Sequence, residues 1–140
     1  MTPEVAAYLD KAREDLADAR KILAISLPKV AARSAYYVAF HAAEALLLAR
    51  TDRIAKTHTG LRAALAQVLP GSAGENRELL TFLARAYKFK ELSDYGIGRA
   101  ADVTEAEASS LIEGATRFLD RVTTLITTPD RGSDQTVSES

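Results

Sequence analysis

The sequence predicts an all-α protein, an up-and-down bundle of four main helices with one short additional helix. Apolar residues recur at steps of three and four through most of the chain, which is the period of a helix, and no stretch shows the alternation of a strand. Proline and glycine divide the chain into segments that are long enough for helices. Short connections between these segments favour antiparallel neighbours.

The first helix is expected to begin after Thr2 and to end near Ser26. Thr2 can cap the first amides, and Pro3 is tolerated in a first turn. Pro28 forces the break, because it lacks an amide proton and disfavours helical geometry in the residue before it. One face of this helix is charged, and the other carries an apolar stripe of Val5, Tyr8, Leu9, Ala12, Leu16, Ala19, Ile22 and Leu23.

The second helix, residues 31–50, is the segment around which the others should pack. One face repeats small or apolar residues, which let a neighbouring backbone come close: Ala32, Ala35, Ala39, Ala42, Ala43 and Leu46. A different stripe combines a cation, a phenol, an imidazole and a carboxylate, and these residues would form one wall of a site: Arg33, Tyr37, His41 and Glu44.

The remaining helices follow from local signals. Polar residues 51–60 predict a loop and a new cap, and a short helix is expected over 61–69. Residues 70–74 form a break. A fourth helix is expected over 79–92, followed by a glycine-containing turn at 93–98.

Thr104 and Glu107 form a capping box that opens the last helix. The apolar stripe of this helix ends near residue 127, and the composition then becomes polar. We therefore expect one helical domain over residues 1–127 and a disordered tail over residues 128–140.

Composition narrows the functional class. The chain has 140 residues, of which 47% are hydrophobic, no cysteine and a net charge of −1. These values suit one domain without disulfides or cysteine zinc sites, and they argue against a generic nucleic-acid-coating protein. No apolar run approaches the roughly 20 residues that span a bilayer, and the start does not resemble a signal segment. A cytoplasmic protein without a membrane segment is expected.

Two segments are locally cationic. The first holds Arg50, Arg53, Lys56 and Arg62 against Asp52, and the second holds Arg85, Lys88, Lys90 and Arg99 against Glu91 and Asp94. They could bind phosphate. They could equally be solvated helix ends, where the helix dipole favours cations.

Only two histidines could move protons. His41 lies within the second helix, where Tyr37 and Glu44 could satisfy it as a structural group. His58 follows Arg53 and Lys56 in the predicted loop, so that an imidazole and two cations could meet one phosphate. The alternative for His58 is an ordinary helix entry capped by Thr57 or Thr59.

A further candidate cluster lies at the end of the fourth helix. Lys88 and Lys90 can be explained by the helix dipole alone. The Tyr95 ring, beside the Asp94 carboxylate and Gly96, could stack a base or present a hydroxyl. Metal chemistry is poorly supported, because His41 and Glu44 cannot complete a zinc site, and no metal or other cofactor is expected.

Three pieces of the chain share one resemblance. Residues 33–47 read Arg-Ser-Ala-Tyr-Tyr-Val-Ala-Phe-His-Ala-Ala-Glu-Ala-Leu-Leu, and the other pieces are Lys56–Gly60 and Ser93–Gly96. Together they resemble the HEPN family of small all-helical domains, over roughly Pro3 to Ile126. The first piece is the most specific of the three.

The resemblance implies a bundle that dimerises and that is often made beside a minimal nucleotidyltransferase as a toxin–antitoxin pair. Many HEPN proteins are metal-independent ribonucleases, with an Arg and a His four to six residues apart at the end of the helix before the last. In them the 2′-hydroxyl attacks the adjacent phosphate while His handles protons and Arg holds charge. Some carry a tyrosine, just after that His, that the partner adenylylates, and Tyr95 lies near this region.

The chain departs from that ribonuclease pattern. Residues 88–95 contain no histidine, whereas Arg53 and His58 have the spacing but follow the second helix. The leading hypothesis is a homodimer that binds a nucleotide or RNA phosphate with a nucleotidyltransferase partner; the alternative is a non-catalytic dimeric interaction protein. The catalytic candidates are His58, His41, Arg53 and Arg33, and the nucleotide- or phosphate-binding candidates are Lys56, Lys90, Asp94 and Tyr37.

Overall fold

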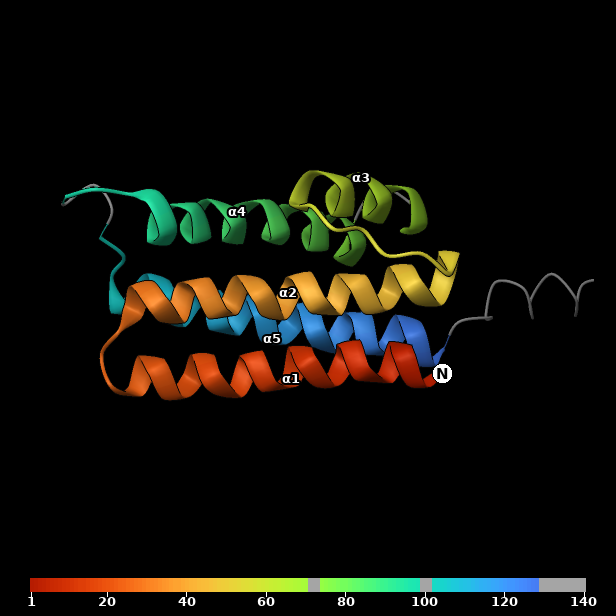
Figure 1. Ribbon diagram of the computed structural model, residues 1–140, viewed down its shortest axis with the longest axis horizontal. Coiled ribbons are helices and arrows are strands. Elements are labelled where there is room, and N and C mark those ends of the chain that lie inside the picture. Colours follow the sequence, from red (N-terminus) through yellow and green to blue (C-terminus); the bar gives the residue numbers. More distant parts are fainter. Residues whose placement is uncertain (71–73, 99–101, 129–140) are drawn as a thin grey trace, which may run out of the picture.

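The structure, a computed structural model, describes residues 1–70, 74–98 and 102–128. It contains five helices: α1 (Pro3–Ala24), α2 (Pro28–Thr51), α3 (His58–Val68), α4 (Glu75–Tyr95) and α5 (Glu105–Thr127). Helices α1, α2, α4 and α5 alternate in direction along the long axis, and the short α3 lies beside α4 (Figure 1). The predicted all-α bundle of four main helices and one short helix is confirmed.

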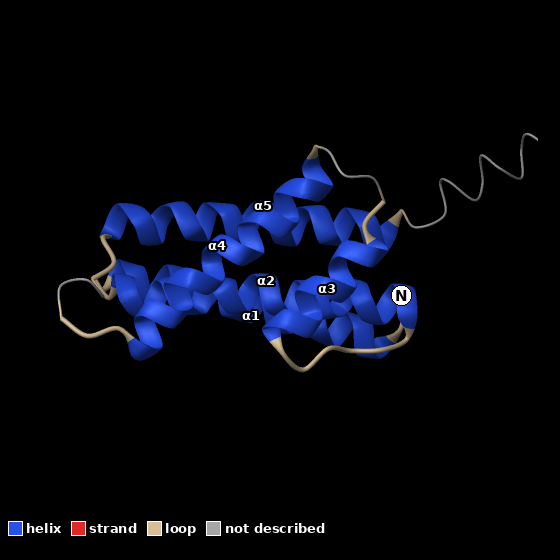
Figure 2. Ribbon diagram, turned by 90° about the horizontal axis from the view of Figure 1, so that it is seen from above, coloured by secondary structure: helices blue, strands red, loops and turns tan. Residues whose placement is uncertain are grey.

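Helix α2 is the centre of the bundle, because it packs against each of the other four helices. The view from above shows the loop between α2 and α3 running back along the bundle before α3 begins (Figure 2). Alanine makes the close packing possible, since a methyl group keeps neighbouring axes near one another. Seven alanines of α2 have no exposed surface: Ala31, Ala32, Ala35, Ala39, Ala42, Ala43 and Ala45.

Threonine side chains cap three helices, as the sequence predicts. The Oγ1 atom of Thr2 accepts a hydrogen bond from the amide of Val5 at 3.2 Å, and that of Thr57 accepts from the amide of Gly60 at 3.0 Å. Thr104 and Glu107 form the full capping box, with both hydrogen bonds at 3.0 Å. Local hydrogen bonding therefore determines where these helices begin.

Two predicted boundaries are wrong. His58 begins α3 instead of lying in a loop, because the Thr57 cap starts the helix three residues earlier than the apolar pattern indicates. Asp94 and Tyr95 belong to the last turn of α4 instead of a glycine-flexed loop. Lys90 pairs with Asp94 one turn later, at 2.9 Å, and such pairs stabilise the end of a helix.

Two predicted segments extend beyond the residues that the structure describes. Residues 129–140 of the predicted tail and residues 71–73 of the predicted break lie outside the described residues. Among the helices that are described, none combines the length and the apolar character needed to cross a membrane.

We expect Ala39→Leu to lower the free energy of unfolding by about 1–3 kcal/mol, because Ala39 is fully buried and a larger side chain must push a neighbouring helix away. Urea unfolding followed by circular dichroism measures the change. The matched control is Ala49→Leu on the same helix, where the residue is exposed and the change should stay within about 0.5 kcal/mol. Equal losses in both variants would contradict the packing argument.

Candidate functional site

The residues of the predicted polar stripe on α2 lie next to one another along the helix. The Arg33 guanidinium lies over the Tyr37 ring, 5.1 Å from its centroid. The Tyr37 ring stacks on His41, with 5.9 Å between centroids and 29° between ring planes. Glu44 differs from these three because its side chain is buried; burial raises the pKa of its carboxyl, and the nearby His41 lowers it. The stripe thus presents three groups at the surface and turns its carboxyl into the core.

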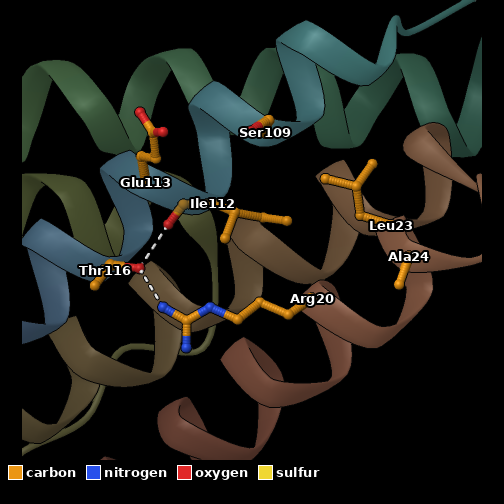
Figure 3. A pocket seen from close by; sticks show the side chains of 7 residues that line it. All are labelled: Arg20, Leu23, Ala24, Ser109, Ile112, Glu113 and Thr116. Atoms are coloured by element: carbon orange, nitrogen blue, oxygen red, sulfur yellow. Dashed lines mark hydrogen bonds between the residues drawn. The ribbon is translucent and has the colours of Figure 1, made fainter.

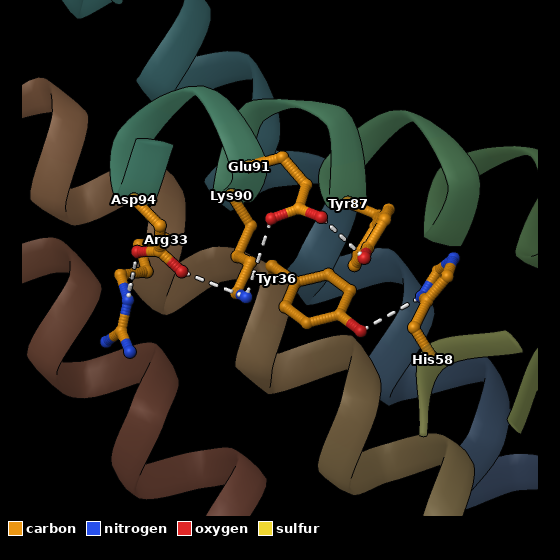
Figure 4. A network of polar contacts seen from close by, with 7 residues as sticks. All are labelled: Arg33, Tyr36, His58, Tyr87, Lys90, Glu91 and Asp94. Carbon is orange, nitrogen blue, oxygen red and sulfur yellow. Dashed lines mark hydrogen bonds and ion pairs between the residues drawn. The ribbon is translucent and has the colours of Figure 1, made fainter. Parts of the chain in front are cut away.

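Ion pairs join the end of α4 to α2 (Figure 4). The Oδ1 atom of Asp94 accepts a hydrogen bond from Nε of Arg33 at 2.8 Å, and its Oδ2 atom lies 2.9 Å from Nζ of Lys90. Only 15% of the Lys90 side chain and 20% of the Asp94 side chain are exposed. The hydrogen bond from Lys90, with a smaller contribution from Arg33, holds the pKa of Asp94 below its usual range. The carboxylate is therefore charged at neutral pH and pairs with two cations.

His58 lies against α4 at Tyr87, about two helical turns before Asp94. Its ring stacks on Tyr87, with 3.7 Å between centroids and 9° between planes, and its Nδ1 atom lies 2.9 Å from the hydroxyl of Tyr36. The Tyr87 hydroxyl in turn donates to Oε1 of Glu91 at 2.6 Å. Figure 4 shows two sets of polar contacts, the Tyr36–His58 pair and a chain that leads from Tyr87 through Glu91 and Lys90 to Asp94 and Arg33; the stacking of His58 on Tyr87 joins them.

We call this set the α2–α3–α4 cluster. It consists of seven residues: Arg33, Tyr36, His58, Tyr87, Lys90, Glu91 and Asp94. One acceptor in it is unused, because Oε2 of Glu91 is buried without a hydrogen-bond partner and the nearest cation, Nζ of Lys90, is 3.8 Å away.

Burial determines the protonation states of Tyr36 and His58. Desolvation, followed by the nearby phenol of Tyr37, raises the pKa of the Tyr36 hydroxyl, so this hydroxyl keeps its proton. Desolvation, followed by the charge of Arg62, lowers the pKa of His58, so the imidazole is neutral at pH 7. Because the Tyr36 proton needs an acceptor, we assign Nδ1 of His58 as the acceptor and Nε2 as the protonated nitrogen. His58 can then donate from Nε2 to a ligand oxygen.

His41 has a different partner. Its Nδ1 atom lies 2.6 Å from Oδ2 of Asp15 on α1, and 19% and 16% of the two side chains are exposed. When Asp15 accepts the Nδ1 proton, Nε2 is left with a lone pair, which is the arrangement of a general base. The sequence does not identify Asp15, since the contact depends on the register between α1 and α2.

Arg53 and Lys56 lie outside this arrangement. Both residues are exposed, and among the described residues neither side chain forms a hydrogen bond or an ion pair. The cations whose charge lowers the pKa of His58 are Arg62 and Lys90. Tyr95, the modification candidate, is 74% exposed at the end of α4, with its ring centroid 5.8 Å from Nζ of Lys90.

The structure also has a hollow between α1 and α5, of about 350 Å³ (Figure 3). Arg20 reaches across it and donates to Oγ1 of Thr116 at 3.2 Å. Apolar Leu23 and Ile112 lie beside this bond, and no predicted site residue lines the hollow. Over the described part of the chain, no three His, Asp or Glu side chains are grouped so that they could hold a metal ion.

The fold and the site define a small helical-bundle protein with an alanine-rich central helix and a polar cluster against the second, third and fourth helices. The HEPN domain model matches residues 5–125. The chain therefore belongs to the HEPN domain family.

Relatives of this chain are about 30% identical to it over most of its length. A UPF0332 protein of Gloeobacter violaceus is 31% identical over 119 residues, which cover 85% of this chain and 93% of the relative. A UPF0332 protein of Thermotoga maritima is 32% identical over 116 residues, covering 83% and 86%. A protein of Methanocaldococcus jannaschii named "Putative toxin" is 29% identical over 119 residues, covering 85% and 86%.

We expect His58→Gln to weaken the dependence of folding stability on pH between about pH 5 and 7. The unfolded chain takes up a proton at His58 near pH 6.5, whereas the folded protein resists it because its pKa is lowered. The native protein should therefore lose stability as the pH falls, and the variant should lose less. Urea unfolding at stepped pH values measures both slopes. His41 is present in both proteins, so equal slopes would refute the assignment to His58.

Proposed function

We propose that this chain is the HEPN component of a toxin–antitoxin-like module and that its α2–α3–α4 cluster binds a phosphate of a nucleotide or of RNA. One observation carries the proposal: Arg33, His58 and Lys90 come from three different helices to one polar cluster (Figure 4). Guanidinium, imidazole and ammonium groups are the side chains that bind phosphate oxygens.

Asp94 supports this proposal because it already behaves as an internal anion. Its two oxygens bridge Arg33 and Lys90. A phosphate could replace the carboxylate without leaving either cation unpaired, since it offers oxygens to both. His58 stacks on Tyr87, about two helical turns before Asp94, so its Nε2 proton would be a neutral donor to another group of the same ligand, held in orientation by Tyr36 and Tyr87.

The finer proposal is a metal-independent endoribonuclease. The 2′-hydroxyl would attack the adjacent phosphorus, lose its proton to a base, and expel the 5′-oxygen, which takes up a proton. His41 suits the base, because Asp15 leaves its Nε2 free, and His58 suits the donor. Arg33 would hold the charge of the phosphorane, and Arg53 and Lys56, from the loop before α3, would bind neighbouring phosphates of the RNA.

The proposed partners follow from family membership. We propose a cytoplasmic homodimer that works with a minimal nucleotidyltransferase, and Tyr95 as the residue that this partner modifies. Its exposure of 74% supports access by another protein. The name of the Methanocaldococcus jannaschii relative supports the toxin–antitoxin role.

A second candidate function is a non-catalytic dimeric interaction protein. The observation that favours it is the same ion pairing: Arg33 and Lys90 are already neutralised by Asp94, and paired charges need no ligand. Tyr36, Tyr37 and Phe40 would then serve packing alone, and their rings do contact one another.

We expect a short single-stranded RNA in excess to raise the melting temperature of the protein, because a ligand that binds only the folded state stabilises it. Lys90→Gln should remove most of this shift. Asp94→Asn should enlarge it, since it frees two cations, even though the unliganded variant melts earlier. Lys88→Gln, an exposed lysine on the same helix, is the control. No shift in the native protein or in Asp94→Asn would favour the interaction protein.

If the protein is a ribonuclease, RNA incubated with it in excess chelator should yield 2′,3′-cyclic phosphate ends. We expect His41→Ala to lower the cleavage rate by about 100-fold or more, in line with the usual contribution of a general base. Analysis of the ends by mass spectrometry identifies the products, and circular dichroism checks that the variant is folded. Unchanged cleavage by folded His41→Ala would remove His41 from the mechanism.

A further inference from the structure

A large groove lies on the other flank of α4, between α4 and α5. Its volume is about 1080 Å³, and its lining comes from residues 74–85 and 114–124. Three of the lining residues each stand nine positions before a member of the α2–α3–α4 cluster: Glu78 before Tyr87, Phe82 before Glu91 and Arg85 before Asp94. Nine positions are about two and a half helical turns, so the groove and the cluster face opposite sides of α4.

Arginines from both helices border this groove. Arg77 and Arg85 come from α4, and Arg117 and Arg121 come from α5. Arg121 is only partly paired. Its Nη1 atom lies 3.1 Å from Oε2 of Glu75, and its Nη2 atom donates to Oδ1 of Asn76 at 3.2 Å. Its Nε atom is buried and has no hydrogen-bond partner among the described residues. A buried guanidinium N–H without an acceptor is costly, so Arg121 is not held by a complete set of hydrogen bonds.

Glu75 is a loosely held anion at the same place. Of its side chain, 69% is exposed, compared with 31% of the Arg121 side chain. Exposed ion pairs contribute little stability, so a better anion can displace the carboxylate. Arg117 is exposed on the same helix, one turn before Arg121, and no hydrogen bond or ion pair of its side chain is found in the described structure.

The floor of the groove is aromatic. The Phe82 ring lies against Gly114, where a Cβ atom would come within 2.3 Å of the ring carbon Cε1. Glycine at this position therefore lets the ring lie where it does. Phe118 lies behind Phe82, with 6.1 Å between ring centroids, and is buried. Phe82 is only partly buried and lines the open groove, so it offers an aromatic surface to a planar ligand.

We propose that this groove is a second ligand site, separate from the α2–α3–α4 cluster, and that it takes a nucleoside monophosphate. The phosphate would pair with Arg117 and Arg121 in place of Glu75, and the base would stack on Phe82. Glu78 and Asp120 also line the groove, and their charges oppose an extended polyanion such as RNA while leaving room for a single phosphate.

Calorimetric titration of the full chain with AMP tests this site. We expect Arg121→Gln and Arg117→Gln each to weaken AMP binding by about tenfold or more, as the loss of a charge-assisted hydrogen bond entails. Glu75→Gln should tighten binding, because it removes the competing carboxylate. Adenosine should bind more weakly than AMP, and Phe82→Leu should weaken both. Arg117→Gln keeps the test valid if Arg121→Gln fails to fold.

Lys90→Gln separates this proposal from the proposed function. It should remove only AMP that binds at the α2–α3–α4 cluster and should keep the binding event that Arg117→Gln removes, whereas Lys88→Gln, an exposed lysine of α4 outside both sites, should change neither. AMP binding that Lys90→Gln abolishes and Arg117→Gln leaves intact would support the cluster and overturn the groove site. No AMP binding, even by Glu75→Gln, would overturn the groove site alone. If the native protein is a dimer and Arg117→Gln is a monomer, the groove is the interface between two copies, and this result would also overturn the proposed site.

Discussion

Close packing around α2 is the constraint on which the rest of the structure depends. Seven of its alanines are fully buried, and the helix contacts all four of the others. Small side chains bring the neighbouring helices so close that polar groups on α1, α3 and α4 reach the flanks of α2. The packing of the core therefore also determines which polar groups can meet.

The two neighbouring tyrosines of α2 show how the packing separates a buried polar group from one at the surface. Tyr36 is 2% exposed and turns toward α3 and α4, where its hydroxyl meets His58. Tyr37, about 100° further round the helix, lies at the edge between Arg33 and His41. Tyr36 thus forms a hydrogen bond with one imidazole in a partly buried site, and Tyr37 contacts a cation and a second imidazole at the surface.

Much of the fold could be predicted because its signals are local. The three threonine caps and the breaks at Pro28 and Gly74 depend on residues a few positions apart. The stripe of Arg33, Tyr37 and His41 follows from helical periodicity alone. The start of α3 and the end of α4 are predicted less well, because the hydrogen-bonded helix extends beyond the apolar pattern at both points.

The candidate site was only partly predictable for a physical reason. The contacts that define it join residues distant in the chain: Tyr36 with His58, Arg33 with Asp94, and Asp15 with His41. Such pairs depend on the register between packed helices, which one sequence does not specify. Arg53 and Lys56 lie near His58 in sequence, but the cations that act on its pKa come from α3 and α4.

We propose that a phosphate takes the place of Asp94 between Arg33 and Lys90 while His58 donates from Nε2 to another group of the same ligand. The most direct measurement is heteronuclear NMR of the side-chain N–H groups during titration with a dinucleotide. We expect the Nε–H resonance of Arg33 and the Nε2–H resonance of His58 to shift together and to saturate at one concentration. Shifts confined to Arg117 and Arg121, or no shift at either Arg33 or His58, would contradict the claim.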